Sequence, residues 1–500
     1  MTHLCVPIFV TKLDKARREI AAALAAGADL IELRIDKIDD DSLVKTLSGE
    51  NPGRTILTRR SKSEGGFHEG GSGISAARDF AYIDIELAAV LSDRMVLGRT
   101  SPDKVILSTH DLRAKPANLD ELVKKANALP AGVNKIVWQA QSILENLDAL
   151  KLLKNSKRPT IALCMGEVGL ISRVLAKKFG AFLTFASLDA ESATAPGQIT
   201  IADLKNLYRW DAIKSTTKVF GVVAHPVRHS MSPAIHNAAF ADIGFDGVYL
   251  PMLVEPDYDS FKSFMDGFLR FDGMDLSGLS VTIPHKENAL RYLKETGSEI
   301  EELGERIGAI NTISIERSGK LSGKNTDYAA ILESITGKLG VGRDGLQGLR
   351  VAVLGAGGTG RAAVAGLTHY GANVIIWNRS GERAKALAEE FEASVMSLDE
   401  LCREECDVFI NATSVGMYPK VEENPLGGRE MPVSAKTLVF DTIYNPMKTR
   451  LLIQAEAAGA KTIGGVEMFV RQAAAQFETW TNQPAPLAIM RRVISDRLDG

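Results

Sequence analysis

The first 215 residues alternate between short apolar runs and segments of helical periodicity, about eight of each. The strand-like runs are residues 5–10, 30–35, 55–59, 82–86, 104–109, 134–139, 159–164 and 182–186, and helical spacing follows most of them, as in 12–26, 119–129, 143–154 and 172–179. Eight strand–helix units in this length predict an α/β fold of the (β/α)8 TIM barrel type. A doubly wound open sheet is the alternative, but this half has no glycine-rich phosphate turn.

Polar residues gather where the expected barrel strands end, which is where barrel enzymes place their chemistry. These residues are Glu32, Arg34, Arg60, Glu86 and His110, while Lys135 lies inside an otherwise apolar strand. Taken singly, each is most simply a solvated strand end or a local hydrogen-bond partner. A lysine in a barrel interior is desolvated, which lowers its pKa and favours the nucleophilic amine. With a histidine to move protons and arginines to hold a carboxylate, the set predicts Schiff-base chemistry on a small carboxylated carbonyl compound.

The segment 209–218 reads as a fusion point, because different chemistry follows it. A buried strand at 219–223 leads to a loop with Ser230 and Ser232 before a proline-led helix. Ser232 alone is most simply an N-cap, but two hydroxyls at a helix N-terminus can also bind a carboxylate. Lys286 and Asp327 lie at later strand ends, where such residues are usually only solvated. Beside a nicotinamide, a lysine–aspartate pair can deliver a proton as a hydride moves.

A nucleotide-binding unit follows at 350–370. A buried strand at 350–354, the turn GAGGTG at 355–360 and a helix at 361–370 form a dinucleotide fingerprint, in which glycines let backbone amides approach a pyrophosphate. The next strand, 373–377, ends in Asn378-Arg379-Ser380. An acid there would hold the ribose hydroxyl of NAD, whereas an arginine suits the 2′-phosphate of NADP. The ordinary alternative for Arg379 is a solvated rim residue. We therefore expect a Rossmann domain that binds NADP.

Composition excludes several classes of function. The formal net charge is −3 without a long run of one sign, so neither nucleic acid nor an anionic membrane is an expected partner. The sequence has no unbroken apolar stretch of about 18 residues and no secretory signal pattern at its start. Four cysteines without clustered partners argue against a metal site. We expect a cytoplasmic, multidomain protein without a metal or a targeting segment.

The first half resembles type I 3-dehydroquinate dehydratases over about residues 4–210. The resemblance rests on ELRID at 32–36, RSKSEGG at 60–66, YIDIE at 82–86, STHD at 108–111, NKI at 134–136, MG at 165–166, SR at 172–173 and APGQ at 195–198. It implies that Lys135 forms an imine with the C3 ketone of 3-dehydroquinate, that His110 is the general acid/base and that Glu86 orients His110. It further implies that the substrate is held by Glu32, Arg34, Arg60, Arg173, Thr194 and Gln198. Many relatives have serine in place of Thr194.

The second half resembles shikimate dehydrogenases throughout. The matching elements are HSMSP at 229–233, SVTIPHK at 280–286, GAINT at 308–312, NTD at 325–327, GAGGTGRA at 355–362, NRS at 378–380, NATSVGM at 411–417 and YNP at 444–446. The resemblance implies that Lys286 and Asp327 are the catalytic pair. It implies that shikimate is held by Ser230, Ser232, Thr282, Asn311, Tyr444 and Gln472. It also implies that NADP is bound by Gly355, Ala356, Gly357, Gly358, Thr359, Gly360, Asn378, Arg379, Ser380, Thr413, Met417 and Gly465.

Together these patterns predict two consecutive reactions on one chain. A barrel at 1–215 converts 3-dehydroquinate to 3-dehydroshikimate, and the rest reduces that product to shikimate with NADPH. We expect a shikimate-binding domain at 219–335 with helices from about 466–500, and a Rossmann domain at 336–465. The expected partners are small molecules, and the expected state is a monomer or weak dimer. Two alternatives stay open: a fused quinate dehydrogenase that prefers NAD, and an inactive quinate-sensing regulator. Arg379 and the presence of Lys135, His110, Lys286 and Asp327 count against them.

Overall fold

The computed structural model describes residues 2–38, 41–51, 53–69, 80–97, 100–192, 197–228, 230–430 and 432–499. The chain forms two compact units. The first comprises Met1–Val219, Asp246–Glu255 and Asp259–Leu276, and the second comprises Phe220–Phe245, Pro256–Tyr258 and Ser277–Gly500.

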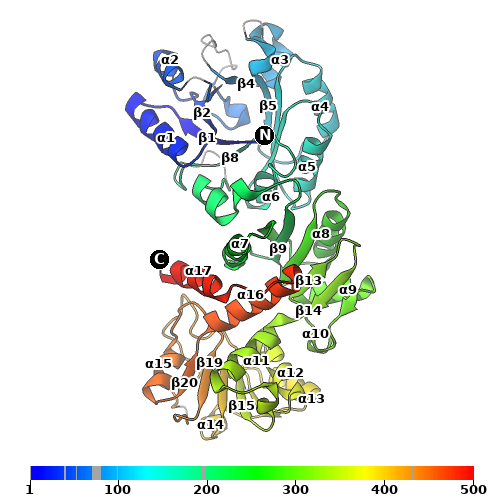
Figure 1. Cartoon of the computed structure of the whole chain (residues 1–500), viewed down its shortest axis with the longest axis vertical. Coiled ribbons are helices and arrows are strands. Elements are labelled where there is room, and N and C mark those ends of the chain that lie inside the picture. The colour runs from blue at the N-terminus through cyan, green and yellow to red at the C-terminus, as the bar shows by residue number, and fades with distance from the viewer. Residues whose placement is uncertain are drawn as a thin grey trace. The chain divides into compact units, whose positions relative to one another are not determined.

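Eight parallel strands of the first unit form a nearly closed barrel ringed by helices (Figure 1). The strands are β1 (His3–Phe9), β2 (Leu30–Arg34), β3 (Thr55–Thr58), β4 (Tyr82–Glu86), β5 (Val105–Asp111), β6 (Val133–Gln139), β7 (Thr160–Met165) and β8 (Leu183–Phe185). Each strand pairs with the next in the chain up to β7, and β8 pairs with β1. The Phe182 N–H donates to the Thr160 carbonyl at 2.9 Å, which joins β8 to β7. The predicted barrel is thus confirmed, with strand limits shifted by one or two residues.

The helices of the barrel are less regular than its strands. They are α1 (Leu13–Ala25), α2 (Asp41–Glu50), α3 (Leu87–Ser92), α4 (Leu119–Asn127), α5 (Glu145–Asn155) and α6 (Leu170–Val174). A short 3-10 turn, Lys62–Glu64, follows β3, and a π-helical turn, Asp203–Leu207, follows β8. The strands are buried almost throughout and read as nearly continuous apolar runs, as parallel strands covered on both faces do. Charged side chains inside the barrel are therefore exceptions that need an explanation.

The expected fusion point, 209–218, is anchored within the first unit. This unit also contains β10 (Gly247–Leu253) and nearly all of α8 (Tyr258–Arg270). Arg209 donates to the Gly247 carbonyl at 2.9 Å, and Thr217 donates to a carboxylate oxygen of Asp246 at 2.6 Å. The buried Lys178 ammonium donates to the Ser215 carbonyl at 2.8 Å and pairs with Asp275 at 2.6 Å. The segment is a fixed part of the first unit and not a free linker.

In the second unit, one sheet has neighbouring strands in the order β9-β11-β13-β14-β12. Its strands are β9 (Lys218–Ala224), β11 (Leu276–Val281), β12 (Glu299–Ile300), β13 (Thr312–Ile315) and β14 (Leu321–Lys324). The helices of this part are α7 (Ser232–Asp242), α9 (Lys286–Glu295), α10 (Glu302–Ile307) and α11 (Thr326–Leu339). Since β13 and β14 are antiparallel, the loops before and after this hairpin bring residue 311 beside the start of α11.

The other sheet of this unit is parallel, in the order β17-β16-β15-β18-β19-β20. Its strands are β15 (Arg350–Leu354), β16 (Asn373–Trp377), β17 (Ser394–Val395), β18 (Val408–Asn411), β19 (Leu438–Asp441) and β20 (Lys461–Ile463), and its helices are α12 (Gly358–His369), α13 (Gly381–Phe391), α14 (Leu398–Leu401) and α15 (Arg450–Ala457). The strand order reverses at β15, as in a Rossmann fold, and ligands bind at such a point. The predicted Rossmann domain is confirmed.

The last two helices are α16 (Gly465–Thr481) and α17 (Leu487–Asp499), drawn in orange and red in Figure 1. They return to the first sheet of this unit, since α16 contacts α11 and α17 contacts α7. The Trp480 indole N–H donates to the Ile313 carbonyl of β13 at 3.1 Å. This return places Gln472 and Gln476 of α16 beside the residues that end β11 and begin β13.

Two candidate active sites

The barrel holds a pocket of about 300 Å³ among the C-terminal ends of its strands. Seven of the predicted residues line it: Glu32, Arg34, Arg60, His110, Lys135, Arg173 and Gln198. Thr194, the sixth substrate-binding prediction for this half, lies outside the described residues. The apolar side chains of Val137, Leu163, Met165 and Phe185 complete the wall. Residues far apart in the sequence thus converge because parallel strands end at one rim.

Lys135 lies inside the barrel on β6 and is buried. Its Nζ atom is 2.8 Å from Asp84 Oδ2 and 3.2 Å from Glu32 Oε1, and it lies 4.5 Å from the centre of the Phe185 ring. The two carboxylates neutralise the ammonium and fix its position at the floor of the pocket. An attacking amine must give up a proton and part from Asp84, so a proton acceptor has to be close.

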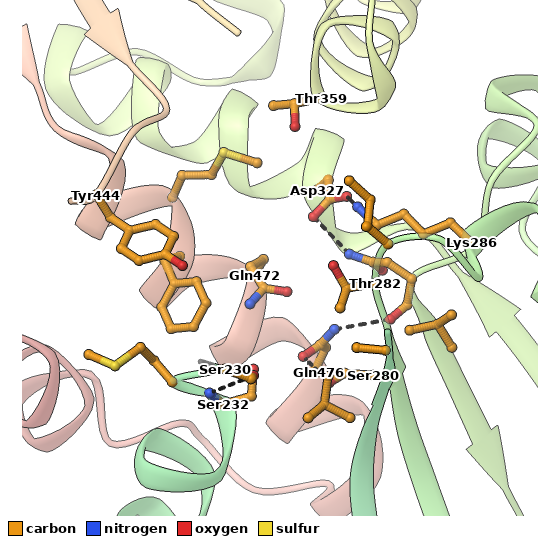
Figure 2. Close-up of a pocket in the computed structure, with 18 of the residues that line it drawn as sticks. Ser230, Ser232, Ser280, Thr282, Lys286, Asp327, Thr359, Tyr444, Gln472 and Gln476 are labelled. Atoms are coloured by element: carbon orange, nitrogen blue, oxygen red, sulfur yellow. Dashed lines mark hydrogen bonds and ion pairs between the residues drawn. The ribbon is translucent and has the colours of Figure 1, made fainter. Parts of the chain in front are cut away.

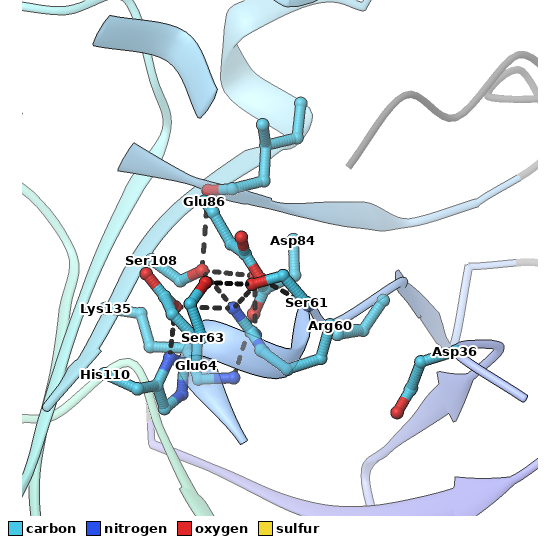
Figure 3. Close-up of polar contacts among 12 residues, drawn as sticks. Asp36, Arg60, Ser61, Ser63, Glu64, Asp84, Glu86, Ser108, His110 and Lys135 are labelled. Atoms are coloured by element: carbon cyan, nitrogen blue, oxygen red, sulfur yellow. Dashed lines mark hydrogen bonds and ion pairs between the residues drawn. The ribbon is translucent and has the colours of Figure 1, made fainter. Parts of the chain in front are cut away.

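His110 lines the same pocket, and its Nδ1 lies 2.9 Å from Glu64 Oε2 (Figure 3). Burial, with Arg60 and Lys135 nearby, holds the pKa of His110 well below its usual range. Burial raises the pKa of Glu64 to about 8, although Arg60 opposes the shift. Near neutral pH a protonated Glu64 can therefore donate to Nδ1 of a neutral imidazole. This arrangement leaves Nε2 as the N–H atom of the ring.

The expectation that Glu86 orients His110 is not met in this structure. Glu86 ends β4, and its carboxylate accepts from the Ser61 N–H at 2.8 Å and lies 3.7 Å from Arg60. The 3-10 turn after β3 instead carries Glu64 to the imidazole. The sequence contained a signal for Glu64, because it lies in the RSKSEGG segment, four residues after Arg60. The search for polar residues at strand ends overlooked Glu64, because a turn and not a strand brings it to His110.

Behind the pocket floor, Arg60 and Asp84 form a buried network that the sequence analysis missed. Arg60 donates to Ser108 Oγ at 2.8 Å and pairs with Asp84 at 2.8 Å and Glu64 at 3.1 Å. Burial alone would raise the pKa of Asp84, but Arg60 and Lys135 hold it well below its usual range. Asp84 is therefore ionised and anchors Lys135. Arg60 is occupied by protein carboxylates and is poorly placed to hold a substrate carboxylate by itself.

Arg173 is the better candidate for that role. It is buried, and its Nε atom has no hydrogen-bond partner within the described ranges. Burial lowers the pKa of this guanidinium to about 10. An uncompensated buried cation at the pocket wall is costly unless an anion joins it. Arg34, by contrast, is bound through two hydrogen bonds to Asp36, at 2.9 and 3.0 Å.

The second unit contains a cleft of about 390 Å³ (Figure 2). All eight predicted substrate and catalytic residues of this half line it: Ser230, Ser232, Thr282, Lys286, Asn311, Asp327, Tyr444 and Gln472. Figure 2 shows Tyr444 facing the Lys286–Asp327 pair across the cleft, with Ser230 and Ser232 at another edge. Burial raises the pKa of the Tyr444 hydroxyl, so it stays a hydrogen-bond donor at neutral pH.

Lys286 and Asp327 form an ion pair of 2.5 Å. Lys286 begins α9, and Asp327 lies in the first turn of α11, which Asn325 caps by accepting from the Asp327 N–H at 3.0 Å. Asn311 donates to the other oxygen of Asp327 at 2.9 Å. Gln476 supports this corner, since it donates to the Asn311 carbonyl at 3.2 Å and accepts from Ser280 at 2.7 Å. The pair is therefore fixed by residues from four elements.

The glycine-rich turn has room for a dinucleotide. A Cβ atom on Gly360 would lie 2.1 Å from the Gly355 carbonyl oxygen, so the turn closes tightly there. A Cβ on Gly357 or Gly358 would meet nothing within 4 Å, which leaves open space over the start of α12 for a pyrophosphate. Asn378 accepts from the Ala356 N–H at 3.2 Å and fixes the turn against the end of β16.

Some of the other predicted cofactor-binding residues lie around this turn. Of the twelve residues, only Thr359 and Gly465 also line the cleft. Arg379 and Ser380 are exposed at the end of β16, as a 2′-phosphate site would require. Arg383, which the sequence analysis missed, is also exposed and lies one helical turn later on α13. The open glycine-rich turn and the exposed arginines after β16 fit NADP. When bound, the nicotinamide of the cofactor would supply a hydride.

Among the residues described, no group of three or more His, Cys, Asp or Glu side chains is arranged to hold a metal ion. Nor does this part of the chain include a helix with the length and apolar character needed to span a membrane.

Sequence comparison finds family matches for both halves of the chain. Residues 4–215 match the type I 3-dehydroquinase family. A bifunctional 3-dehydroquinate dehydratase/shikimate dehydrogenase, described as chloroplastic, from Arabidopsis thaliana is 39% identical over 98% of this chain and 84% of its own length. The chain belongs to this bifunctional family. It is a dehydratase and an NADP-dependent shikimate dehydrogenase of the shikimate pathway.

In the second half of this bifunctional enzyme, family matches cover both the substrate-binding part and the nucleotide-binding part. Residues 222–313 match the shikimate dehydrogenase substrate binding domain, 340–441 match shikimate/quinate 5-dehydrogenases, and 465–494 match the C-terminal domain of shikimate 5′-dehydrogenases. An NADP(+) shikimate dehydrogenase from Methanopyrus kandleri is 38% identical over 57% of this chain and 98% of its own length. A crystal structure of a shikimate dehydrogenase in complex with NADP+ is 36% identical, with a TM-score of 0.51, over 57% of this chain and 97% of that one.

Proposed function

We propose that Lys135 is the imine-forming residue of the dehydratase and His110 its acid/base. When Glu64 is ionised and accepts from His110 Nδ1–H, Nε2 of the imidazole takes a proton from the ammonium. The amine then adds to the C3 ketone of 3-dehydroquinate, and the carbinolamine loses water to give the iminium. The iminium acidifies the adjacent C–H, so a proton and then a hydroxide leave as a second water molecule. Hydrolysis of the imine consumes one water and releases 3-dehydroshikimate. The observation that carries the proposal is the buried Lys135 in one pocket with His110 and the uncompensated Arg173.

Arg173 would hold the substrate carboxylate, with Arg34, Glu32 and Gln198 around the hydroxyl groups. Glu64 would orient His110 through Nδ1, and Asp84 would return Lys135 to its resting position. We retain Glu86 as a residue that fixes the 3-10 turn through Ser61, and thereby Glu64.

Reductive trapping tests the imine directly. The protein is mixed with 3-dehydroquinate and borohydride, and its mass and peptide map are recorded. The expected result is a stable adduct on Lys135, with none on the Lys135→Ala variant. An adduct on another lysine, or normal dehydration by Lys135→Ala, would refute the assignment.

We propose that Lys286 and Asp327 act as the proton-transfer pair of the dehydrogenase. When bound, NADPH supplies the hydride to the ketone carbon of 3-dehydroshikimate. The Lys286 ammonium lies in the cleft and donates the proton to the ketone oxygen, while Asp327 and Asn311 keep it in place. Ser230 and Ser232 near the start of α7 would hold the carboxylate, and Tyr444 and Gln472 the ring hydroxyls.

We also propose the division into a barrel at 1–215, a shikimate-binding domain at 219–335 with the last helices, and a Rossmann domain at 336–465. The predictions of a monomer or weak dimer, of a cytoplasmic location and of no nucleic-acid or membrane partner stay proposals. Because one matching family covers shikimate and quinate dehydrogenases, quinate with NAD is the comparison substrate pair. We expect a higher kcat/KM for shikimate with NADP, and the reverse preference would refute this assignment.

A further inference from the structure

Asp441, the last residue of β19, is a fully buried carboxylate outside the cleft lining. Its Oδ1 atom accepts from Asn411 Nδ2 at 3.0 Å and from the Ile443 N–H at 3.1 Å. Its Oδ2 atom accepts from Thr449 Oγ1 at 2.6 Å. In the described part of the chain, no basic side chain forms an ion pair with it. Burial accordingly raises the pKa of this carboxyl group.

An acid in this position is costly, and an apolar residue could end the strand instead. The donors it collects come from two different loops. One loop follows β18, whose last residue is Asn411, and the other follows β19 and runs through Ile443 to the N-cap of α15 at Thr449. The carboxylate is therefore the common acceptor that joins both loops.

The first loop lies against the glycine-rich turn. Asn411 Oδ1 accepts from the Thr413 N–H at 3.0 Å and from its hydroxyl at 2.7 Å. A Cβ atom on Gly355 would lie 3.0 Å from the Thr413 methyl group and 2.9 Å from the Ala412 carbonyl oxygen. The position of this loop thus limits the position of the turn that would hold the pyrophosphate.

The second loop carries two residues of the cleft wall. Thr442 and Tyr444 flank Ile443 and both line the cleft. The start of α16 is packed tightly against this loop, since a Cβ on Gly465 would lie 2.4 Å from the Thr442 carbonyl oxygen. A shift of the Ile443 backbone would therefore move Tyr444 and the first turn of α16 together.

We propose that Asp441 is a positioning residue for the dehydrogenase site. It fixes the loop after β18, which contacts the glycine-rich turn, relative to the loop after β19, which carries Tyr444. This inference rests on the proposed function of that site. One buried side chain would thus align the glycine-rich turn with the wall of the cleft.

The test compares Asp441→Ala with Asp441→Asn. The asparagine keeps an acceptor for Asn411 and Ile443, and the Thr449 hydroxyl can turn to accept from its amide, so the network keeps its shape. The alanine leaves three donors without an acceptor. Asp407→Ala is the matched control, because Asp407 accepts from the Arg350 N–H at 2.9 Å at the opposite end of the same sheet and is exposed.

The readouts are the Kd of NADPH by fluorescence titration, KM and kcat for shikimate, and the dehydratase activity of the same molecules. We expect Asp441→Ala to raise the Kd and KM about tenfold, equivalent to the loss of roughly one good hydrogen bond. Asp441→Asn should stay within about threefold of wild type, which is below 1 kcal/mol. Dehydratase activity and the Asp407→Ala control should not change.

A purely structural role would reduce the active fraction, which lowers kcat and leaves Kd and KM unchanged. Wild-type Kd and KM in a folded Asp441→Ala variant would therefore overturn the inference. If that variant does not fold, Thr449→Val removes one bond to Asp441 together with the N-cap bond from the Leu452 N–H, and should raise Kd about threefold. An unchanged Kd would be decisive against the inference. Failure of the wild type to reduce 3-dehydroshikimate would instead refute the proposed function, because the NADPH titration needs no turnover.

Discussion

Replacing Glu64 with glutamine tests the structural account of the barrel site in two ways. The amide has the shape of the protonated carboxyl group and can donate to His110 Nδ1 in the same manner. With a pKa of about 8 for Glu64 in the folded protein, roughly nine in ten molecules keep this proton at neutral pH. Geometry and activity near neutral pH should therefore survive the substitution.

The stability of the folded protein, unlike its activity, should change with this substitution. The pKa of Glu64 rises from an ordinary value of 4.5 to about 8 on folding, so the unfolded chain loses this proton first as the pH rises. The contribution of Glu64 to stability is thus most favourable below about pH 4.5 and is lost up to about pH 8. At 1.36 kcal/mol per pKa unit, the penalty is on the order of 3 kcal/mol at pH 7 and below about 1 kcal/mol at pH 5. Glu64→Gln removes it.

The assay is urea unfolding of the full chain at pH 5 and pH 7. Residual dehydratase activity is the readout, so that only unfolding of the barrel is monitored. Glu64→Gln should match wild type at pH 5 and be more stable at pH 7. We expect the dehydratase kcat of wild type to titrate near pH 8 and that of Glu64→Gln not to. Glu86→Gln is the control and should retain both pH dependences. If Glu86→Gln abolishes them and Glu64→Gln does not, the reasoning about His110 is wrong.

Three further substitutions address the remaining assignments. Arg173→Met should raise KM for 3-dehydroquinate by about 10–100-fold with a smaller change in kcat, because it removes a charge-assisted contact; an unchanged KM would exclude Arg173 as the carboxylate anchor. Asp327→Asn should lower the dehydrogenase kcat by at least about 100-fold and leave dehydratase activity intact, which separate assays of the two reactions would show. Arg379→Ser should raise KM for NADPH about tenfold and leave KM for NADH unchanged, whereas equal effects on both would contradict the 2′-phosphate assignment.

The sequence was sufficient to predict elements with strong periodicity. All eight barrel strands and the Rossmann fingerprint occur where the patterns placed them, because parallel strands buried on both faces leave continuous apolar runs. Barrel helices were less predictable: the segment expected to be helical at 172–179 forms only α6, Leu170–Val174. This short helix is almost entirely buried, and a short helix is stabilised mainly by packing that sequence periodicity does not record.

Contacts between distant segments were harder to predict than the residues themselves. The pairing of Glu64 with His110 depends on a turn that folds back over β5, whereas the family resemblance had implied Glu86 as the partner of His110. The network of Asp441 joins residues 30 and 8 positions away along the chain. In both cases the residue types were visible, but which donor meets which acceptor is set by tertiary packing.

One chain carries two candidate sites, and together they should catalyse consecutive reactions. The most direct measurement supplies the purified protein with 3-dehydroquinate and NADPH and follows NADPH oxidation together with shikimate by chromatography. The account predicts one shikimate for each NADPH oxidised. It also predicts that Lys135→Ala blocks the reaction from 3-dehydroquinate but not from 3-dehydroshikimate, and that Lys286→Ala stops it at 3-dehydroshikimate. Absence of shikimate from wild type, or shikimate from 3-dehydroquinate with Lys135→Ala, would contradict it.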